Sequence, residues 1–460
     1  MSNPGDTDAT PIASEKQLAD YLAVGCKPPS AFRLGTEHEK FGFYTNDLAV
    51  PPYARESGRA GGIQALLEGL SHAGATPITD NGNIIGLKGA DGGAISLEPA
   101  GQFELSGAPL EDLHQTHAEF AAHFADVRRV AGPLGIGFAP LGFHPLARRE
   151  DMRWMPKGRY AIMRAYMPKV GSRGLDMMTR TCTVQVNLDY ASEADMVDKL
   201  RVSLCLQPLA TALFANSPFV EGKPTGHLSN RALVWTDTDR QRSGIPEVFF
   251  EDGFGFERYV RWMVDSVPMY FVYRNGRYID VAGRSFRAFI DGLLGAPEAG
   301  IPTMGDFADH LTTVFTDVRL KRFLEMRGAD AGTLEMMVAQ SALWTGLLYD
   351  GAALAAAKAL VARYGWRDLV ALRGLVPRTG IATPWRGGTL RDLAREVLAI
   401  ARDGLAARGR KNAAGQDERV YLEPLDAIAA GAPSQAEHWL ERYHGAWHGD
   451  ASAALREAAI

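Results

Sequence analysis

Cysteine is scarce in this sequence, with only Cys26, Cys182 and Cys205 among 460 residues. An odd and low count does not indicate a disulfide framework, and it is typical of proteins that work in a reducing compartment. The first residues are polar and acidic, without the basic and apolar stretches of a signal peptide. We therefore expect a cytoplasmic location.

Long apolar runs and basic stretches are also missing. No apolar run approaches the ~18 residues that a membrane helix needs, so we expect no membrane partner. The formal net charge is −5, from 49 Lys and Arg residues against 54 Asp and Glu residues, and no basic stripe stands out. We expect no nucleic-acid partner for this reason. Local arginine clusters indicate small anionic ligands instead.

Several common catalytic motifs are absent. The sequence has no G-x-x-x-x-G-K-[ST] phosphate loop and no G-x-G-x-x-G between a predicted strand and a helix. It also lacks H-E-x-x-H, C-x-x-C and G-x-S-x-G. These absences argue against a phosphate-loop nucleotidase, a dinucleotide enzyme, a zinc peptidase and a serine hydrolase of the usual kinds.

What the sequence does contain is a mixture of strand and helix patterns, which predicts an α+β fold. Strands are expected within residues 30–45, 82–107 and 180–190, helices over 15–24, 61–74, 110–134 and 192–213, and an Asn275–Gly276 hairpin over 268–281. Residues 351–364, 389–404 and 433–443 are alanine-rich or helical in spacing. We predict a loose tail over residues 1–14 and a single domain over 15–460, with the sheet in 15–332 and a helical part in 333–460 packed on it.

The most informative segment is RTCTVQVNLDY, residues 180–190, which alternates without a break. Its apolar face would hold Cys182, Val184, Val186 and Leu188, and its polar face Thr181, Thr183, Gln185, Asn187 and Asp189. A merely solvated face would more often carry Lys or Glu. Amides and hydroxyls therefore favour a ligand-binding floor.

Two further strands carry carboxylates. Glu37 and Glu39 would point the same way, about 7 Å apart along their strand, and such a pair repels unless a cation lies between. Glu104 shares a strand face with Gln102 and Ser106, and Glu98 precedes a Pro-Ala-Gly turn. The alternative for both strands is a solvated edge with its charges in water.

Basic residues gather around one carboxylate in VRLKRFLEMRGAD, residues 318–330. Arg319, Lys321, Arg322 and Arg327 surround Glu325 in the sequence. This pattern suits a metal-bound phosphate, although a salt-bridged helix surface is an equal alternative. Elsewhere, Arg159 and Arg231 lie near aromatic residues, where arginine often binds a carboxylate, but each alone is more often structural.

The candidate metal ligands in these segments are hard oxygen donors, with almost no Cys or His among them. The oxygen-bearing set is Glu37, Glu39, Glu98, Glu104 and Glu325, with Gln185. Such ligands suit Mg²⁺ or Mn²⁺, ions that usually arrive with nucleotide phosphates. The residues therefore predict magnesium-dependent phosphoryl chemistry on a sheet floor without a phosphate loop.

The motifs also carry a family resemblance, in order and over residues 15 to 460. They are GTEHEKFGF (35–43), SLEPAGQFELSGAPLE (96–111), MPKGRY (155–160), YMPKVGSRGLDMM (166–178), RTCTVQVNLDY (180–190), ANSPFVEGKPTGHLSNR (215–231), VPMYFVYRNGRYIDVAG (267–283) and VRLKRFLEMRGADAG (318–332). Together they resemble glutamate–cysteine ligases of the plant-type branch, which is also found in proteobacteria.

The resemblance implies a fold, a reaction and ligands. The family fold is a six-stranded antiparallel β-sheet funnel with surrounding helices, related to the catalytic part of glutamine synthetase. The implied reaction joins the γ-carboxylate of glutamate to the amine of cysteine through a γ-glutamyl phosphate, the first step of glutathione synthesis. ATP would be the co-substrate, and two or three Mg²⁺ ions the cofactors, with Mn²⁺ as a substitute.

The resemblance also implies roles for individual residues. Metal ligands would be Glu37, Glu39, Glu98, Glu104, Gln185 and Glu325. The amino-acid pocket would contain Arg159, Arg231, Tyr270, Asn187 and Thr183, and the phosphate side Lys321, Arg322 and Arg327. Arg327, Arg231 and Arg159 are the predicted catalytic residues. A carboxylate is a poor electrophile, so phosphorylation gives it a leaving group, and Arg327 would stabilise charge on the phosphoryl oxygens.

One departure from the plant members concerns redox control. Their hairpin cysteine, in YIDCTG, is replaced here by Val281 in YIDVAG, and His117 fills another plant cysteine position. We therefore predict a monomer or weak homodimer without a disulfide-linked dimer. Three rival functions remain open: a ligase for another amine, a guanidino phosphotransferase on the same sheet architecture, and a non-catalytic metal or amino-acid binding protein.

Overall fold

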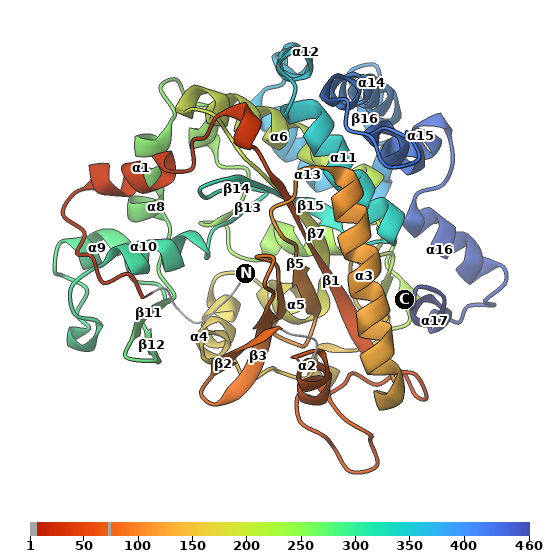
Figure 1. The fold of residues 1–460 in the computed structure, drawn as a ribbon, viewed down its shortest axis with the longest axis horizontal. Helices are drawn as coiled ribbons and strands as arrows, with labels where there is room; N and C mark the ends of the chain where they lie inside the picture. Colours follow the sequence, from red (N-terminus) through yellow and green to blue (C-terminus); the bar gives the residue numbers. More distant parts are fainter. Residues whose placement is uncertain (1–6, 72–74) are drawn as a thin grey trace.

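An antiparallel sheet forms the centre of the computed structural model, which describes residues 7–71 and 75–460 (Figure 1). Its strands run in the order β14 (Val318–Leu320), β15 (Leu324–Asp330), β7 (Thr183–Leu188), β1 (Leu34–Tyr44), β5 (Phe103–Ser106), β4 (Ala94–Leu97), β3 (Asn83–Lys88) and β2 (Thr76–Asp80). β6 (Ile136–Ala139) pairs with the far half of β1. The described part of the sheet thus has nine strands.

The α+β class and the antiparallel sheet are confirmed, but six strands is too low a count for this sheet. The reason is length: β14 has three residues and β6 has four, too few to display an alternating pattern. The long strands were identifiable because they alternate over many residues, as β7 does between its neighbours β1 and β15.

A layer of helices covers the apolar face of the sheet. It contains α3 (Leu113–Ala131), α6 (Glu193–Leu213) and α11 (Leu334–Leu348), which pack against β1, β7 and β15 (Figure 1). Val184, Val186 and Leu188 are buried there, as their alternation predicts. The hydrophobic core therefore lies between the sheet and these helices.

Most of the predicted helical C-terminal part lies outside that layer. It comprises α12 (Gly351–Val361), α13 (Trp366–Thr379), α14 (Leu390–Arg408), α15 (Glu423–Ala430), α16 (Gln435–His444) and α17 (Ala453–Glu457). α11 connects it to the sheet, because it contacts both β7 and α14. In the described part of the chain, no helix combines the length and the apolar character needed to cross a bilayer.

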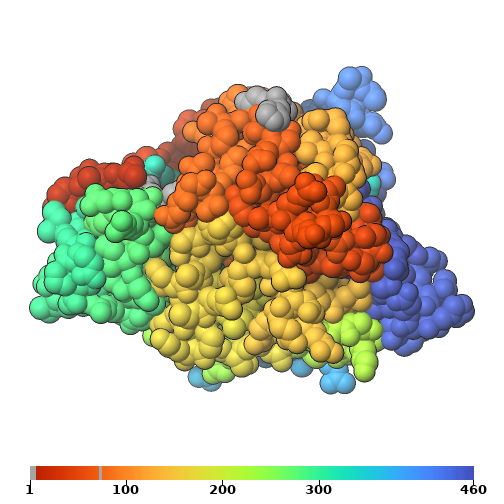
Figure 2. All heavy atoms as spheres, turned by 90° about the horizontal axis from the view of Figure 1, so that it is seen from below, coloured from red at the N-terminus to blue at the C-terminus, as the bar shows by residue number. Residues whose placement is uncertain are grey.

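Short helices cover the polar face of the sheet: α4 (Gly158–Tyr166), α5 (Gly174–Arg180) and α7 (Asn230–Val234). Seen from below in Figure 2, the α4–α5 region, in yellow, lies between N-terminal segments in orange and a green region that includes the 268–281 hairpin. That hairpin is formed by β11 (Phe271–Arg274) and β12 (Arg277–Asp280), and its turn has φ 50° at Asn275 and 78° at Gly276. The predicted Asn–Gly turn is confirmed.

The remaining helices lie around the sheet and its covering helices: α1 (Glu15–Ala23), α2 (Ile63–Ser71), α8 (Phe256–Ser266), α9 (Phe286–Ile290) and α10 (Met304–Leu311). Three pairs of short strands complete the fold: β8 with β9 (Phe219–Val220, Lys223–Pro224), β10 with β13 (Ser243–Gly244, Phe315–Thr316) and β16 with β17 (Pro384–Trp385, Gly388–Thr389). Ser14 caps α1 by accepting a hydrogen bond from the backbone N of Gln17. Residues 72–74, the end of the predicted 61–74 helix, lie outside the described residues.

The described part of the predicted tail, residues 7–14, differs from a loose segment. Its backbone pairs with residues 302–305: Ile12 N donates to Pro302 O, and Met304 N donates to Thr10 O. This short pairing docks the segment beside α10, because its extended residues find backbone partners there. Residues 1–6 lie outside the described residues.

Candidate active site

A cavity of about 120 Å³ lies over the polar face of the sheet. Ten of the predicted site residues line it: Glu37, Glu39, Glu98, Glu104, Thr183, Gln185, Arg159, Arg231, Lys321 and Arg327. They come from β1, β5, β7, β15, α4, α7 and the turns beside β4 and β14. The sheet thus collects, at one place, side chains that are almost 300 residues apart in the sequence.

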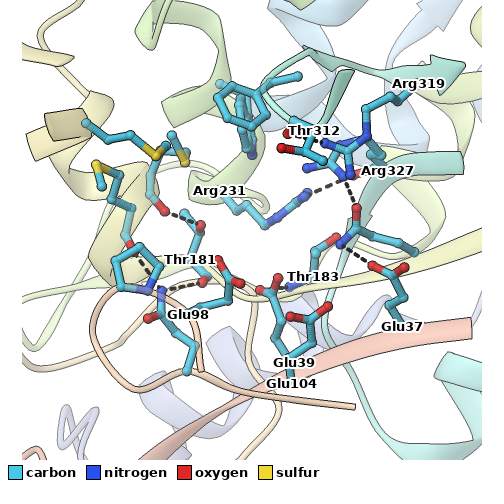
Figure 3. Close-up of a pocket in the computed structure, with 18 of the residues that line it drawn as sticks. Glu37, Glu39, Glu98, Glu104, Thr181, Thr183, Arg231, Thr312, Arg319 and Arg327 are labelled. Carbon is cyan, nitrogen blue, oxygen red and sulfur yellow. Dashed lines mark hydrogen bonds between the residues drawn. The ribbon is translucent and has the colours of Figure 1, made fainter. Parts of the chain in front are cut away.

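One end of the cavity is acidic (Figure 3). Glu39 and Glu104 are directly opposite each other on the antiparallel strands β1 and β5, an arrangement that disfavours two like charges. Burial and the neighbouring Glu98 and Glu104 carboxylates hold the pKa of Glu39 well above its usual range. Burial and Glu104 likewise raise the pKa of Glu98 to about 7. Lys157 and Arg159 partly offset this effect, because their positive charges act to lower the pKa of Glu98.

Hydrogen bonds fix the direction of these carboxylates. Thr183 N donates to Glu39 Oε2 at 3.0 Å, and the hydroxyls of Ser96 and Ser106 donate to Glu104 at 2.5 and 3.0 Å. The nearby Lys157 ammonium donates to Leu97 O at 2.6 Å, and burial lowers its pKa to about 8. The oxygens are therefore oriented in advance, which limits the entropy lost when they bind a cation.

A divalent cation fits this donor set. The ligands are hard oxygens, and the mutual repulsion of Glu39, Glu98 and Glu104 would be relieved by positive charge. Among the described residues, no three Asp, Glu, His or Cys side chains converge closely enough to enclose an ion by themselves. Mg²⁺ usually takes one or two carboxylates and completes its shell with water and substrate phosphates.

The middle of the cavity floor is a chain of amides. Asn187 Nδ2 donates to Glu37 Oε1 at 2.9 Å, and Gln185 Nε2 lies 3.5 Å from Glu37 Oε2. Gln185 Oε1 accepts a hydrogen bond from the guanidinium of Arg327. Gln185 therefore connects the acidic strand β1 with the basic strand β15.

The other end of the cavity is basic. Arg319, Lys321 and Arg327 all contact the Glu325 carboxylate, at 2.7, 2.9 and 2.5 Å. Burial alone would raise the pKa of Glu325, but these three cations hold it well below its usual range. Three positive charges around one negative charge leave a net positive surface, which suits phosphate oxygens.

Two further arginines line the cavity. Arg159 is only 5% exposed, its guanidinium is 5.2 Å from the Phe271 ring centre, and within the described residues it makes no ion pair. Arg231 is 3% exposed and donates to Arg327 O at 2.9 Å. A buried guanidinium without a carboxylate at ion-pair distance is costly.

Comparison with known proteins identifies the family. The model of glutamate–cysteine ligase family 2 matches residues 33–457. The chain belongs to glutamate–cysteine ligase family 2. Joining glutamate to cysteine, the first step of glutathione synthesis, is the activity of this family, so the reaction implied by the sequence motifs is confirmed at that level.

Plant relatives agree with this membership. The chain is 50% identical to the chloroplastic glutamate–cysteine ligase of Arabidopsis thaliana over 95% of this chain and 81% of that protein. It is also 50% identical to chloroplastic glutamate–cysteine ligase B of Oryza sativa subsp. japonica, over 95% and 85% of the two chains. The resemblance to the plant-type branch is therefore confirmed.

A solved structure shares the fold. It is a glutamate–cysteine ligase of Francisella tularensis in complex with AMP, with a TM-score of 0.56 and 12% identity over 93% of this chain and 88% of that chain. At this identity the match supports the architecture alone, namely an antiparallel sheet covered by helices.

The predicted cytoplasmic location is contradicted by these relatives. The plant ligases of Arabidopsis thaliana, Brassica juncea, Medicago truncatula and Oryza sativa are chloroplastic enzymes. The inference failed because a low cysteine count indicates only a reducing environment and does not identify the compartment.

Four predicted site residues do not line the cavity. Asn187 donates a hydrogen bond to Glu37, and Glu325 is fully buried beneath its three cations. Tyr270 is 1% exposed in the core, with its ring 3.9 Å from the Arg242 guanidinium. Arg322 turns away from the cavity and lies 3.9 Å from the Tyr21 ring centre. The structure therefore places Tyr270 and Arg322 apart from the other site residues.

Other lining residues were not in the predicted site. The sequence could have identified Arg319 and Thr181 as site residues, because Arg319 lies in the basic segment 318–330 and Thr181 in the polar segment 180–190. Tyr160, Met163, Met177, Met178, Trp235 and Phe315 also line the cavity. These apolar and aromatic side chains look like ordinary core residues in the sequence, and only the packing of α4, α5 and α7 over the sheet reveals their position.

Proposed function

We propose that this cavity ligates glutamate to cysteine with ATP as co-substrate and that each end of the cavity has a separate task. The observation that supports this most strongly is the division of charge: three neighbouring carboxylates at one end, and three cations around a single carboxylate at the other. ATP with a divalent cation matches such a surface better than either amino acid alone does.

Glu39, Glu98 and Glu104 would each contribute ligands to Mg²⁺, no more than two of them to any one ion, with Glu37 and Gln185 beside them as further ligands. Bound there, Mg²⁺ would screen the negative charge that ATP and the glutamate carboxylate bring together. The contribution of the chain is orientation, because Thr183, Ser96 and Ser106 fix the carboxylates by hydrogen bonds. Glu325 lies too deep to line the cavity, so its predicted metal contact stays a prediction, as do the number of ions and the use of Mn²⁺.

Arg319, Lys321 and Arg327 would bind the phosphate oxygens. Glu325 holds all three in place, so they are positioned before the substrate arrives. Preorganised positive groups lower the free energy of a transition state whose phosphoryl oxygens carry negative charge. Arg327 has the additional link to Gln185, which brings it next to the carboxylate floor.

Arg159 and Arg231 would bind the carboxylate of glutamate. Both are buried in the cavity wall, and within residues 7–71 and 75–460 no carboxylate lies at ion-pair distance from Arg159. A guanidinium can bind a carboxylate through two hydrogen bonds and thereby fix its orientation as well as its position. The γ-carboxylate would then point toward the phosphate end.

The chemistry follows from this placement. An oxygen of the γ-carboxylate attacks the γ-phosphorus of ATP, the bond to the bridging oxygen breaks, and ADP leaves. The cysteine amine then attacks the acyl carbon, loses a proton, and displaces orthophosphate as the amide forms. The cysteine thiol takes no part, so the reaction needs no cysteine from the chain. The chain would act as a monomer or weak homodimer, without a disulfide-linked dimer.

The test is orthophosphate release from Mg-ATP with glutamate, with and without cysteine or 2-aminobutyrate. We expect release only with both amino acids, and its loss in Glu39→Gln. Glu119→Gln is the matched control, because Glu119 is a half-buried glutamate that contacts Ala108 N and does not line the cavity. Release with another amine but not with cysteine would contradict the acceptor, and no release with any pair would contradict the ligase.

A further inference from the structure

Asp330, the last residue of β15, is a buried carboxylate that the proposed chemistry does not use. It is 1% exposed and does not line the cavity. Gly142 packs directly on it, since a Cβ at Gly142 would lie 2.4–2.6 Å from the Asp330 side chain. The close approach leaves the carboxylate no room to change its orientation.

Two separate chain segments converge on Asp330. Its Oδ2 accepts from Ser217 Oγ at 2.6 Å and from Asn216 N at 2.9 Å. Its Oδ1 accepts from Ser229 Oγ at 2.9 Å. Ser217 and Ser229 lie at the two ends of the loop that contains β8 and β9, so Asp330 connects both ends of this loop to the end of β15.

The same network reaches Arg231 in two ways. Ser229 is the N-cap of α7, which carries Arg231, and Ser217 Oγ accepts from the backbone N of Arg231 at 3.2 Å. In addition, Arg231 Nη1 is 3.9 Å from Asp330 Oδ1, and within the described residues Asp330 is its only acidic partner at salt-bridge distance. Both the backbone and the guanidinium of Arg231 therefore depend on Asp330.

We infer that Asp330 is a positioning residue for substrate binding and acts through Arg231. Its remaining partners are neutral donors, so three hydrogen bonds stabilise the carboxylate while its charge balances the buried guanidinium. The second nitrogen of that guanidinium donates to Arg327 O, which leaves it facing the cavity at a fixed angle. This inference rests on the proposed function, in which Arg231 binds the glutamate carboxylate.

If Asp330 positions Arg231, replacing Asp330 should weaken the binding of glutamate selectively. In Asp330→Asn the shape is kept but the charge is lost, so we expect KM for glutamate to rise about tenfold, with kcat and KM for ATP changed less than about threefold. Glu418→Gln is the matched control: Glu418 is also fully buried and binds an arginine, Arg408, at 2.8 Å, but far from the cavity. It should lower the thermal midpoint without changing KM for glutamate.

A double-mutant cycle distinguishes positioning from general destabilisation. We expect Arg231→Gln to raise KM for glutamate, and Asp330→Asn to add little in the Arg231→Gln background, because its effect passes through that side chain. An unchanged KM in Asp330→Asn, or a full addition of the two effects, would overturn the inference. If wild type releases no orthophosphate with glutamate and cysteine, the proposed function has failed, and with it the substrate assigned to Arg231.

A second variant covers the case in which Asp330→Asn does not fold. Ser217→Ala removes one hydrogen bond to Asp330 and one to the backbone of Arg231, while the ion pair remains. We expect a rise of about threefold in KM for glutamate, again absent in the Arg231→Gln background. An unchanged KM in a folded Ser217→Ala protein would count against the network.

Discussion

The two ends of the cavity handle buried charge in opposite ways. At the basic end, Glu325 and its three cations form a compact cluster whose carboxylate is strongly stabilised in its ionised form. At the acidic end, burial disfavours the ionised forms of Glu39 and Glu98. The carboxylates of Glu98 and Glu104 add to this effect at Glu39, and that of Glu104 adds to it at Glu98. The basic end is thus complete within the protein, and we propose that the acidic end is incomplete until a divalent cation binds.

This difference indicates how the site would assemble. Preformed cations can receive phosphate oxygens without rearrangement, while the carboxylates gain stability only when a divalent ion arrives. The nucleotide and its metal ion therefore match complementary halves of one surface. A substitution that disturbs one half can therefore be compared with the intact other half or with a residue outside both.

The largest expected effect is on catalysis at the basic end. Arg327→Gln removes a guanidinium that contacts both Glu325 and Gln185, and we expect kcat to fall about 10²- to 10³-fold, since groups that stabilise transition-state charge have effects of this size. Initial rates of orthophosphate release measure it. A kcat within threefold of wild type would show that Arg327 is not near the transferred phosphoryl group.

Glu325→Gln should affect stability most. It leaves three buried or half-buried cations without their common partner, and breaking such a cluster costs about 3–5 kcal/mol. Urea unfolding measures the loss of unfolding free energy. Glu39→Gln is the contrast at the acidic end, where removing one of several repelling carboxylates should stabilise the metal-free protein. If both variants lost equal stability, the proposed difference between the ends would be wrong.

The acidic end also predicts a pH dependence. Because burial and Glu104 raise the pKa of Glu98 to about 7, the folded protein binds a proton between roughly pH 5 and 7 that the unfolded chain does not bind. Metal-free protein should therefore lose stability as the pH rises through this window. Glu98 is partly open to the cavity, so we expect only about 1 kcal/mol. Unfolding of wild type and Glu98→Gln at pH 5 and 7.5 measures the difference, which the variant should lack.

The smallest effect is expected at a residue outside both ends. Arg322 lies against Tyr21 and not in the cavity, so Arg322→Ala should change KM for ATP less than about twofold, the range of ordinary surface substitutions. Lys321→Ala, the neighbouring cation inside the cavity, provides the comparison and should raise that KM clearly. Equal effects would mean that Arg322 turns inward when ATP binds.

The sequence predicted the floor of the site better than its walls. Alternation in residues 180–190 is a local property, so it identified the polar face on which Thr183 and Gln185 now line the cavity. Tyr270 and Arg322 were misplaced because their direction depends on partners from distant segments. Tyr270 packs on Arg242, and Arg322 occupies the turn between β14 and β15 and points back to α1.

The residues of the cavity walls could not be predicted from the sequence, because their position also depends on distant segments. Met163 and Trp235 have no chemical signal that separates a cavity wall from a hydrophobic core, and Asp330 resembles any acidic residue at the end of a strand. Strand number was also underestimated, because very short strands such as β14 become visible only through their pairing. Tertiary packing decided each of these features.

Binding of Mn²⁺, followed by electron paramagnetic resonance in the absence of nucleotide, tests most directly whether the acidic end needs an external cation. Wild type and the control Glu119→Gln should bind the ion with the same affinity, and Glu39→Gln should bind it at least about tenfold more weakly, because a carboxylate ligand and its charge are lost. Equal binding by Glu39→Gln, or no binding by wild type, would contradict the division of the cavity into a complete and an incomplete half.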